Sequence, residues 1–304
     1  MMVETAKNAG KLALIIPTKD RPAEIRRALD SLAGQVLKPD QVIVVDGGAR
    51  SVEAEVMSFP ELKPIYLRAE KPSAAGQRNL GLSAADEGCA LVGFLDDDAV
   101  LEPSAVEKML KFWESAPPGV GGAAFNLSNH PLLYASHLKR SRLAKHLGLY
   151  SDERGRVLRS GFQTMIGRVK EDIFVDWLTS GASVWRAPVF ERFRFDEWYE
   201  GYSYLEDLDF SYQVGKEFRL AVVADARYCH LPASAGRGNG VKFGRREVRN
   251  RLHFVKKNPE LSLGLCRLAL GLRMAMSFLL FVRDGQRAHL GRVVGNCIEL
   301  FRIS

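Results

Sequence analysis

Short apolar runs alternate with helix-patterned stretches over the first third of the chain. The apolar runs are too short for helices and are typical of strands buried on both faces; they lie at residues 12–16, 41–46, 64–67 and 90–95. The stretches beside them carry apolar residues at helical spacing, at residues 23–32, 75–85 and 103–113. Apolar strands separated by helices predict an α/β domain whose doubly wound, mostly parallel sheet is covered by helices on both faces.

The alternation weakens in the middle of the chain, and residues 134–168 are basic, irregular and assigned to no element. Further on, a helix is expected to begin at Glu206, with carboxylates in its first turn, where the helix dipole favours them. A strand at residues 220–223 comes next and is followed by His230. The second half therefore adds at least one more helix and one more strand.

Two further helices are predicted near the C-terminal end, at residues 261–282 and 286–302. The first is strongly apolar, but Arg267 and Arg273 lie on different faces, and each would cost roughly 2.5 to 3.5 kcal/mol at the centre of a bilayer. We therefore expect no full crossing. The second has the one-sided apolar pattern of a helix that lies in a membrane interface. The sequence leaves two placements open for these helices, on a membrane surface or against the core of the protein.

The distribution of charge also separates the C-terminal helices from the rest of the 304-residue chain. From Arg237 onward there are 14 Lys or Arg against 4 Asp or Glu, a net charge of +10, so the rest of the chain, whose total is +7, carries −3. This asymmetry disfavours nucleic acid as a partner and points to a basic segment that meets an anionic surface, with membrane lipid as the first candidate. We expect a sheet domain at 1–235, divided at about residue 125, and a basic helical extension at 236–304.

The cysteines and the N-terminus indicate the compartment. The four cysteines show no C-x-x-C spacing, which disfavours a zinc site and a disulfide framework and fits a reducing cytoplasm. The N-terminal residues before the first strand contain no apolar run of the kind that a secretory signal requires. We expect a cytoplasmic protein, peripheral on the cytoplasmic face of the membrane.

Acidic residues collect where predicted strands end, the edge at which open α/β sheets bind ligands. Asp46 ends the second strand, and Asp96, Asp97 and Asp98 follow the fourth. Alternate side chains of an extended segment point the same way, so Asp96 and Asp98 can reach one face. Carboxylates suit Mg²⁺ or Mn²⁺, and such ions leave positions open for the phosphates of a nucleotide. The alternative is a solvated acidic turn that caps the next helix. Neither a G-x-G-x-x-G after the first strand nor a P-loop motif is present.

A set of motifs in fixed order resembles the inverting glycosyltransferases of family 2, which have the GT-A fold. The matching segments cover roughly residues 12 to 258 and are Ile16-Pro17-Thr18, Val44-Val45-Asp46-Gly47, Gly76-Gln77-Arg78-Asn79-Leu80-Gly81, Phe94-Leu95-Asp96-Asp97-Asp98 and Glu206-Asp207-Leu208-Asp209. The resemblance implies a GT-A sheet domain, with a nucleotide-binding half at about 10–125 and an acceptor half at about 126–235. It also implies a nucleotide-diphosphate sugar as donor and a glycan or lipid-linked acceptor.

The resemblance assigns roles on the donor side. It implies that Asp46 contacts the nucleobase, with Pro17, Thr18 and Arg21 beside it, and that Arg78 lies near the nucleotide or diphosphate. In the D-x-D motif it implies that Asp96 is the acid on the ribose side and that Asp98 is a metal ligand. His230 would add a metal or phosphate contact, and Asp97 is grouped with the nucleotide-binding residues.

On the acceptor side the resemblance makes Asp207 the catalytic base and Glu206 a neighbour that positions the acceptor. The alternative is that these acids only satisfy the dipole of their helix. The Gln-x-x-Arg-Trp motif of the processive synthases is missing, so we expect the addition of one sugar. Two other functions stay open: a nucleotidyltransferase acting on a sugar phosphate, and a non-catalytic scaffold that binds carbohydrate or membrane.

Overall fold

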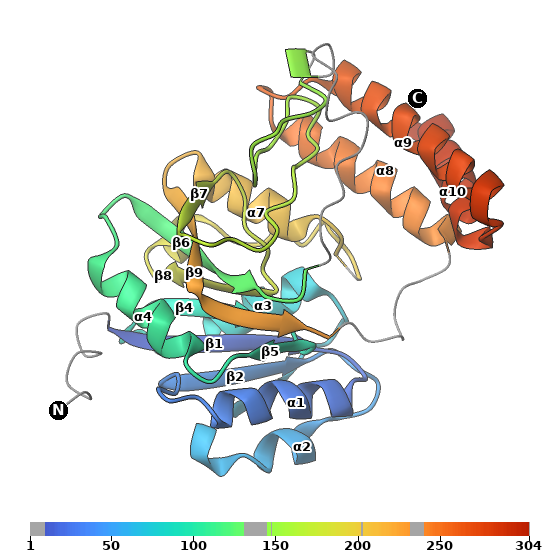
Figure 1. Cartoon of the computed structure of the whole chain (residues 1–304). Coiled ribbons are helices and arrows are strands. Elements are labelled where there is room, and N and C mark those ends of the chain that lie inside the picture. Colours follow the sequence, from blue (N-terminus) through green and yellow to red (C-terminus); the bar gives the residue numbers. More distant parts are fainter. Residues whose placement is uncertain (1–9, 131–144, 147, 202, 232–239, 304) are drawn as a thin grey trace. The chain divides into compact units, whose positions relative to one another are not determined.

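The computed structural model describes residues 10–130, 145–146, 148–201, 203–231 and 240–303. The chain divides into two compact units, one of residues 1–133 and 166–233 and the other of residues 134–165 and 234–304. The first unit contains the sheet and the second contains the C-terminal helices (Figure 1). The boundary expected at residue 235 lies outside the described residues.

The described strands of the first unit form one nine-stranded sheet in the order β3-β2-β1-β4-β8-β6-β9-β5, with β7 paired to β9. Its parallel half consists of β1 (Lys11–Thr18), β2 (Gln41–Asp46), β3 (Ile65–Arg68) and β4 (Cys89–Leu95). The other half contains β5 (Ala99–Leu101), β6 (Val120–Leu127), β7 (Ile173–Val175), β8 (Ala182–Arg186) and β9 (Arg219–His230). The strand β8 runs antiparallel to β4 and β6, whereas β6 and β9 are parallel.

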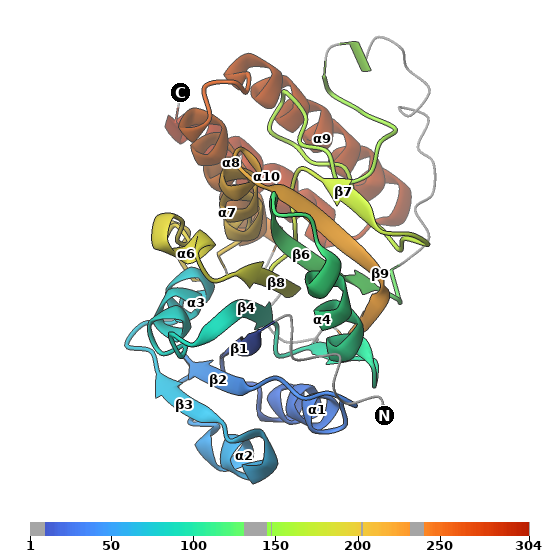
Figure 2. The same cartoon turned by 90° about the vertical axis from the view of Figure 1, so that its left-hand side faces the viewer.

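Helices cover both faces of this sheet because successive strand residues point to opposite sides. Leu12, Leu14 and Ile16 pack on one face with the helices α1 (Pro22–Ala33), α2 (Glu53–Met57) and α4 (Ala105–Ser115). Ile15 and Phe94 pack on the other face with α3 (Ala74–Ser83), α6 (Val189–Arg192) and α7 (Glu206–Gly215). Figure 2 shows α1 and α4 on one side of the strands and α3 and α6 on the other.

The doubly wound, mostly parallel sheet and the C-terminal helices predicted from the sequence are confirmed. The sequence pattern missed the short elements α2, α6, the 3-10 helix η2 (Pro60–Leu62), β5 and β7, because three to five residues carry no clear period. It also assigned no element to the longer β6 and α8 (Gly240–Lys257) or to β8, which runs antiparallel to both of its neighbours.

The second unit includes the helices α8 (Gly240–Lys257), α9 (Leu263–Asp284) and α10 (Arg287–Ile303), shown in orange to red in Figure 1. Glycines allow α8 and α10 to pack backbone against backbone. A Cβ atom on Gly244 would lie 2.2 Å from the carbonyl oxygen of Arg292, and one on Gly295 would lie 2.1 Å from that of Val241. No side chain fits at these positions without separating the two helices.

Gly244→Ala should destabilise the second unit by about 1 to 3 kcal/mol, because the added methyl group must push α10 away from α8. Gly271→Ala, in the middle of α9, is the matched control: no heavy atom of the described residues lies within 4 Å of its Cβ position, so alanine should add up to about 1 kcal/mol through helix propensity. Urea unfolding of both variants measures the difference. Equal effects of the two substitutions would contradict the close packing of α8 and α10.

Candidate active site

The carboxyl ends of the parallel strands bring the predicted donor-side residues to one edge of the sheet. Thr18, at the end of β1, is paired in register with Asp46, at the end of β2. Asp96 follows β4, the other neighbour of β1, and its backbone N–H donates to the carbonyl of Gly181 before β8. Residues far apart in the sequence therefore meet where the strands end.

The three consecutive aspartates have three different surroundings. Asp97 is buried and accepts hydrogen bonds from the Thr18 hydroxyl at 2.8 Å and from Arg21 at 2.9 Å. Burial raises the pKa of Asp97 to about 6, against the opposing effect of Arg21. The side chain of Asp96 is 36% exposed, so it is the most accessible of the three. Thr18 and Arg21 thus hold the aspartate turn through Asp97.

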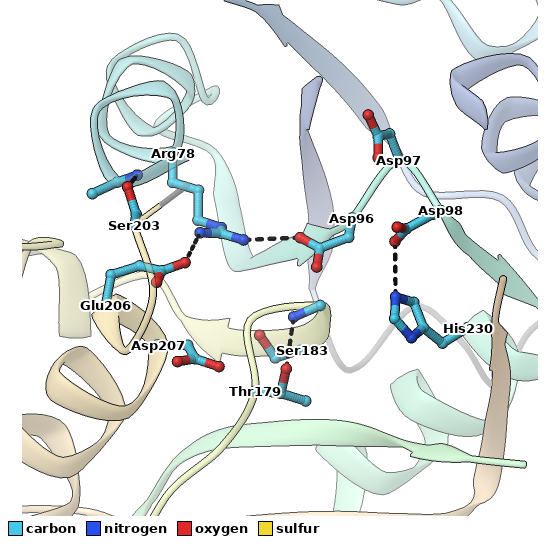
Figure 3. A network of polar contacts seen from close by, with 12 residues as sticks. Arg78, Asp96, Asp97, Asp98, Thr179, Ser183, Ser203, Glu206, Asp207 and His230 are labelled. Carbon is cyan, nitrogen blue, oxygen red and sulfur yellow. Dashed lines mark hydrogen bonds and ion pairs between the residues drawn. The ribbon is translucent and has the colours of Figure 1, made fainter. Parts of the chain in front are cut away.

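Asp98 pairs with His230, whose Nε2 lies 3.1 Å from one carboxylate oxygen (Figure 3). The antiparallel pairing of β5 with β9 places them together, since Ala99 is opposite His230 in the register. Arg21 lies 3.3 Å from the other oxygen. Burial alone would raise the pKa of Asp98, but the hydrogen bond and charge of His230 and the charge of Arg21 outweigh it and lower the pKa. Asp98 is therefore a carboxylate at neutral pH.

Asp98 and His230 offer an oxygen and a nitrogen donor that fit a divalent metal. Among the described residues no group of three or more His, Cys, Asp or Glu side chains is arranged to hold an ion. A Mg²⁺ or Mn²⁺ site in proteins often uses only one or two side chains and completes its shell with phosphate oxygens and water. The pair therefore fits an ion that arrives with a diphosphate.

Arg78 joins the donor-side and acceptor-side acids. This side chain on α3 is buried, and its two terminal nitrogens donate to Asp96 and to Glu206, both at 2.8 Å (Figure 3). Its guanidinium also lies over the ring of Phe195, 5.4 Å from the centroid. Each terminal nitrogen thus donates to a carboxylate of the protein, and the implied place of Arg78 near the diphosphate stays a prediction.

Glu206 and Asp207 begin α7 after a backbone turn of unusual conformation. Leu205, directly before them, has φ of 80°, a left-handed conformation that costs a non-glycine residue about 1 to 3 kcal/mol and is found most often at functional sites. Burial and the charge of Asp207 raise the pKa of Glu206 to about 8, although Arg78 acts to lower it. Burial also raises the pKa of Asp207, and the nearby Asp96 adds to this effect. The two carboxyls therefore retain protons more readily than surface acids.

Asp46 is fully buried and already accepts several hydrogen bonds from its surroundings. One oxygen accepts from the Gly48 N–H at 2.7 Å, and the other accepts from the Tyr66 hydroxyl at 2.7 Å and from Arg68 at 2.6 Å. These contacts close the loop after β2, and the contact with a nucleobase stays a prediction. Sequence reasoning missed Tyr66 and Arg68, although the short strand β3 ends at the same edge of the sheet.

Two other residues near the site, Gln77 and Thr179, were given no role by the sequence analysis. Gln77, buried on α3, donates to the backbone carbonyls of Thr18 and Val45 and so ties α3 to the ends of β1 and β2. Thr179 accepts a hydrogen bond from the N–H of Gly181 beside Asp96 (Figure 3).

The predicted site residues fall into two groups joined by hydrogen bonds and ion pairs. The first group consists of Thr18, Arg21, Asp97, Asp98 and His230, and the second consists of Arg78, Asp96 and Glu206. Asp207 lies next to the second group, whereas Asp46 forms its own cluster and Pro17 lies within β1.

The chain is similar in sequence to a family of glycosyltransferases. The family model described as "Glycosyl transferase family 2" matches residues 13–173. The uncharacterized glycosyltransferase YwdF of Bacillus subtilis is 32% identical over 107 residues, which cover 35% of this chain and 39% of that protein. The O-antigen chain rhamnosyltransferase RfbN of Salmonella typhimurium is 30% identical over 108 residues, 35% of this chain and 34% of that protein. The match therefore spans less than half of the length of these relatives.

Solved structures share the fold at low sequence identity. The mannosyltransferase PcManGT from Pyrobaculum calidifontis, in complex with GDP-Man and Mn²⁺, has a TM-score of 0.58 at 14% identity, covering 98% of this chain and 89% of that one. Residues 1–349 of S. aureus TarS, in complex with UDP-GlcNAc, have a TM-score of 0.54 at 16% identity, covering 86% and 70%. At this identity the likeness establishes the fold alone.

Proposed function

The chain belongs to glycosyl transferase family 2, and from this premise we propose that it moves one sugar from a nucleotide-diphosphate sugar to a lipid-linked or cell-surface polysaccharide acceptor. The observation that carries the proposal is the bridge made by Arg78, which holds a donor-side acid, Asp96, and an acceptor-side acid, Glu206, on one guanidinium. Such an arrangement brings together the two halves that a transfer reaction needs, a site for the leaving nucleotide and a base for the acceptor. We place both in a catalytic domain of residues 1–235.

The donor would lie along the carboxyl edge of the sheet. Solved neighbours of the same fold were crystallised with GDP-Man and Mn²⁺ and with UDP-GlcNAc, which supports a nucleotide sugar as donor. Asp98 and His230 would hold Mg²⁺ or Mn²⁺, and Asp96 would face the ribose. The ion would supply positive charge to the departing diphosphate. A glycan acceptor is supported by the curated relatives, among them the O-antigen rhamnosyltransferase and the amylovoran biosynthesis glycosyltransferase AmsE of Erwinia amylovora.

The configuration at the anomeric carbon would be inverted in a single displacement, in which one carboxylate acts as base on the acceptor hydroxyl. The acceptor oxygen forms a bond to the anomeric carbon while the bond from that carbon to the diphosphate breaks, and the electron pair leaves with the nucleotide. Asp207 takes the proton of the acceptor hydroxyl. Its raised pKa makes it a stronger base than an ordinary aspartate, and a proton held on Glu206 leaves the neighbouring Asp207 free to ionise. Glu206 would position the acceptor.

A donor screen tests the reaction. The purified protein is incubated with Mn²⁺ and, one at a time, UDP-, GDP- and dTDP-sugars, with and without a membrane extract as acceptor source, and released nucleoside diphosphate is measured. We expect release with one donor, increased by the extract. Release of pyrophosphate from a nucleoside triphosphate and a sugar phosphate would identify a nucleotidyltransferase instead, and no reaction with any donor would favour a non-catalytic scaffold.

Removal of the metal ion and substitution of its carboxylate ligand should both reduce nucleotide release. EDTA should suppress nucleotide release, and Asp98→Asn should lower it about 100-fold, because the charge that stabilises the leaving diphosphate is worth several kcal/mol. Asp225→Asn is the matched control, since Asp225 is 77% exposed and has only a weak surface pairing with Arg227. Full activity of Asp98→Asn in EDTA would contradict a metal site at Asp98.

The basic C-terminal helices complete the proposal. Their net positive charge fits the anionic surface of a membrane, where a lipid-linked acceptor would be found. We place the protein on the cytoplasmic face, as a peripheral protein.

A further inference from the structure

One side of α9 forms a continuous apolar surface that is exposed. Leu268, Leu272, Met276, Leu279 and Val282 follow one another at intervals of three or four residues, so their side chains lie along one side of the helix. Each is between 45% and 66% exposed. From the first to the last the surface is about 21 Å long at 1.5 Å per residue. We call these five residues the α9 surface.

A flank of α9 carries a charged contact with the neighbouring helices, centred on a buried glutamate. Glu247 of α8 is fully buried and accepts hydrogen bonds from Arg273 of α9 at 3.3 Å and from Arg292 of α10 at 2.8 Å. Burial would raise the pKa of Glu247, but the two arginines outweigh it and lower the pKa, so the cluster is ionised. Arg273, in the middle of the apolar helix, therefore reaches toward Glu247 from the flank of α9, although its side chain is 43% exposed.

This cluster opposes a crossing of the bilayer. Among the described residues α9 is the one helix long and apolar enough to cross a membrane by length and composition. A crossing would carry Arg273 to the middle of the bilayer, together with its partners Glu247 and Arg292 on the packed helices. Charged side chains are strongly disfavoured there. A helix that exposes an apolar surface and has charged side chains on its flank and at both of its ends instead lies in the plane of the interface.

Arginines flank the α9 surface at both ends. Arg267 precedes it by one residue, Arg283 follows it by one, and Arg287 begins the next helix; all three are exposed. Their long apolar stems can lie along an apolar surface while the guanidinium groups reach outward to phosphate. The described helical segment 240–303 carries 13 Lys or Arg against 4 Asp or Glu. The charge therefore matches the anionic headgroups of a bilayer.

A second copy of the chain fits this surface poorly. In projection the surface covers about 200 Å², from its length and a helix diameter of about 10 Å. A stable protein interface buries about 800 Å² on each partner. Two copies would also bring the same arginines together.

We propose that the α9 surface binds an anionic lipid bilayer, with α9 lying in the plane of the membrane interface and the Glu247 cluster on its flank. The proposal identifies the surface through which the C-terminal helices bind the membrane. It rests on the proposed function only in its account of why the protein binds there, which is to bring the site to a lipid-linked acceptor. The binding itself needs no donor and no catalysis.

Sedimentation of the full chain with lipid vesicles tests it. We expect binding to phosphatidylcholine vesicles that contain phosphatidylglycerol and much weaker binding to phosphatidylcholine alone. The double variant Leu272→Asp/Leu279→Asp should lower the partition coefficient about 30-fold or more, because two half-buried leucines leave the lipid and two like charges approach it. Val36→Asp/Met57→Asp, which changes two exposed apolar residues of the sheet unit, is the matched control and should bind as the parent does. Circular dichroism checks that both variants are folded.

Other outcomes would overturn the proposal. Failure of the parent chain to bind, or binding unchanged in the α9 variant, would show that this surface does not meet lipid. Resistance of the bound protein to extraction by alkaline carbonate would show a helix that crosses the bilayer. A dimer in sedimentation velocity that the α9 variant loses would show that a second copy covers the surface. Nucleotide release in the absence of vesicles is measured separately, so a failure of the proposed reaction is distinguishable from a failure of lipid binding.

Discussion

Asp207→Asn should lower the turnover number for transfer by about 10² to 10⁴-fold, the range expected when a general base is removed. Asparagine keeps the size of the side chain and its position at the start of α7, but it cannot accept the proton of the acceptor hydroxyl. The donor site is formed by other residues, so the dissociation constant for the nucleotide sugar should stay within about threefold of the parent value. Stopped assays of transfer and calorimetric titration of the donor measure the two quantities.

Glu206→Gln is the matched comparison for this prediction. Because the pKa of Glu206 is raised to about 8, the side chain carries a proton at neutral pH, and glutamine resembles that protonated form. We expect a loss of less than about tenfold, much smaller than for the base. A larger loss from Glu206→Gln than from Asp207→Asn would exchange the roles of the two residues.

The pH dependence of transfer should report the same base. A base acts only when deprotonated, so turnover should fall as pH decreases through the pKa of Asp207. Burial raises that pKa, and the acidic limb should therefore lie above the ordinary range of an aspartate, about 3.9. A turnover number that is constant from neutral pH down to that value would contradict the assignment.

Most strands and helices of the first third of the chain could be predicted from their apolar period, whereas the eight-residue β6 and the eighteen-residue α8 were not predicted. The alternation around β1, β2 and β4 fixed the parallel half of the sheet, and with it the edge at which Asp46 and Asp96 lie. The antiparallel β8 could not be predicted, because its direction depends on packing between strands distant in sequence. The same holds for the pairing of β5 with β9, which brings His230 to Asp98.

The residue types of the site could be predicted, but the partners of each side chain could not. The resemblance implied that Arg78 lies near the diphosphate, but it gave no sign that Asp96 and Glu206 are its partners within the protein. It implied that Thr18 and Arg21 lie beside Asp46, and Thr18 is paired with Asp46 in register, but it did not show that both side chains bind Asp97. A motif specifies a position on the backbone, while the partner of a buried polar side chain depends on which donors and acceptors the whole fold brings within hydrogen-bond distance.

A similar limit applies to the C-terminal helices. The sequence showed that Arg267 and Arg273 lie on different faces of the first of them. It could not show that Glu247, on another helix, pairs with Arg273 and leaves the α9 surface free of charge. The buried acid is separated from its two arginines by 26 and 45 residues, so the pairing is a property of the folded helices alone.

Above about pH 8, where Glu206 of the parent is ionised, Arg78→Met should destabilise the sheet unit by about 3 to 5 kcal/mol, the cost of removing one partner of a buried ion pair. The cost should depend on pH. The folded state holds the proton of Glu206 up to about pH 8, whereas the unfolded chain releases it near pH 4.5. The free energy of unfolding of the parent therefore falls as pH rises from about 4.5 to about 8. Without Arg78 the pKa of Glu206 rises further, and the variant continues to lose stability above pH 8. The difference between variant and parent should therefore widen as pH rises through about 8.

Urea unfolding at pH 6, 7.5 and 9 measures this difference, with Arg192→Met as the matched control. Arg192 pairs with Glu217 on the surface, where both side chains are well exposed, so its loss should cost less than about 1 kcal/mol at every pH. Arg78→Lys should recover part of the stability, since an ammonium can replace the charge but cannot reach both carboxylates with a planar fork. If Arg78→Met instead weakened donor binding and left stability and its pH dependence unchanged, the guanidinium would act on the diphosphate. The bridge between Asp96 and Glu206 would then have no part in holding the two acids together.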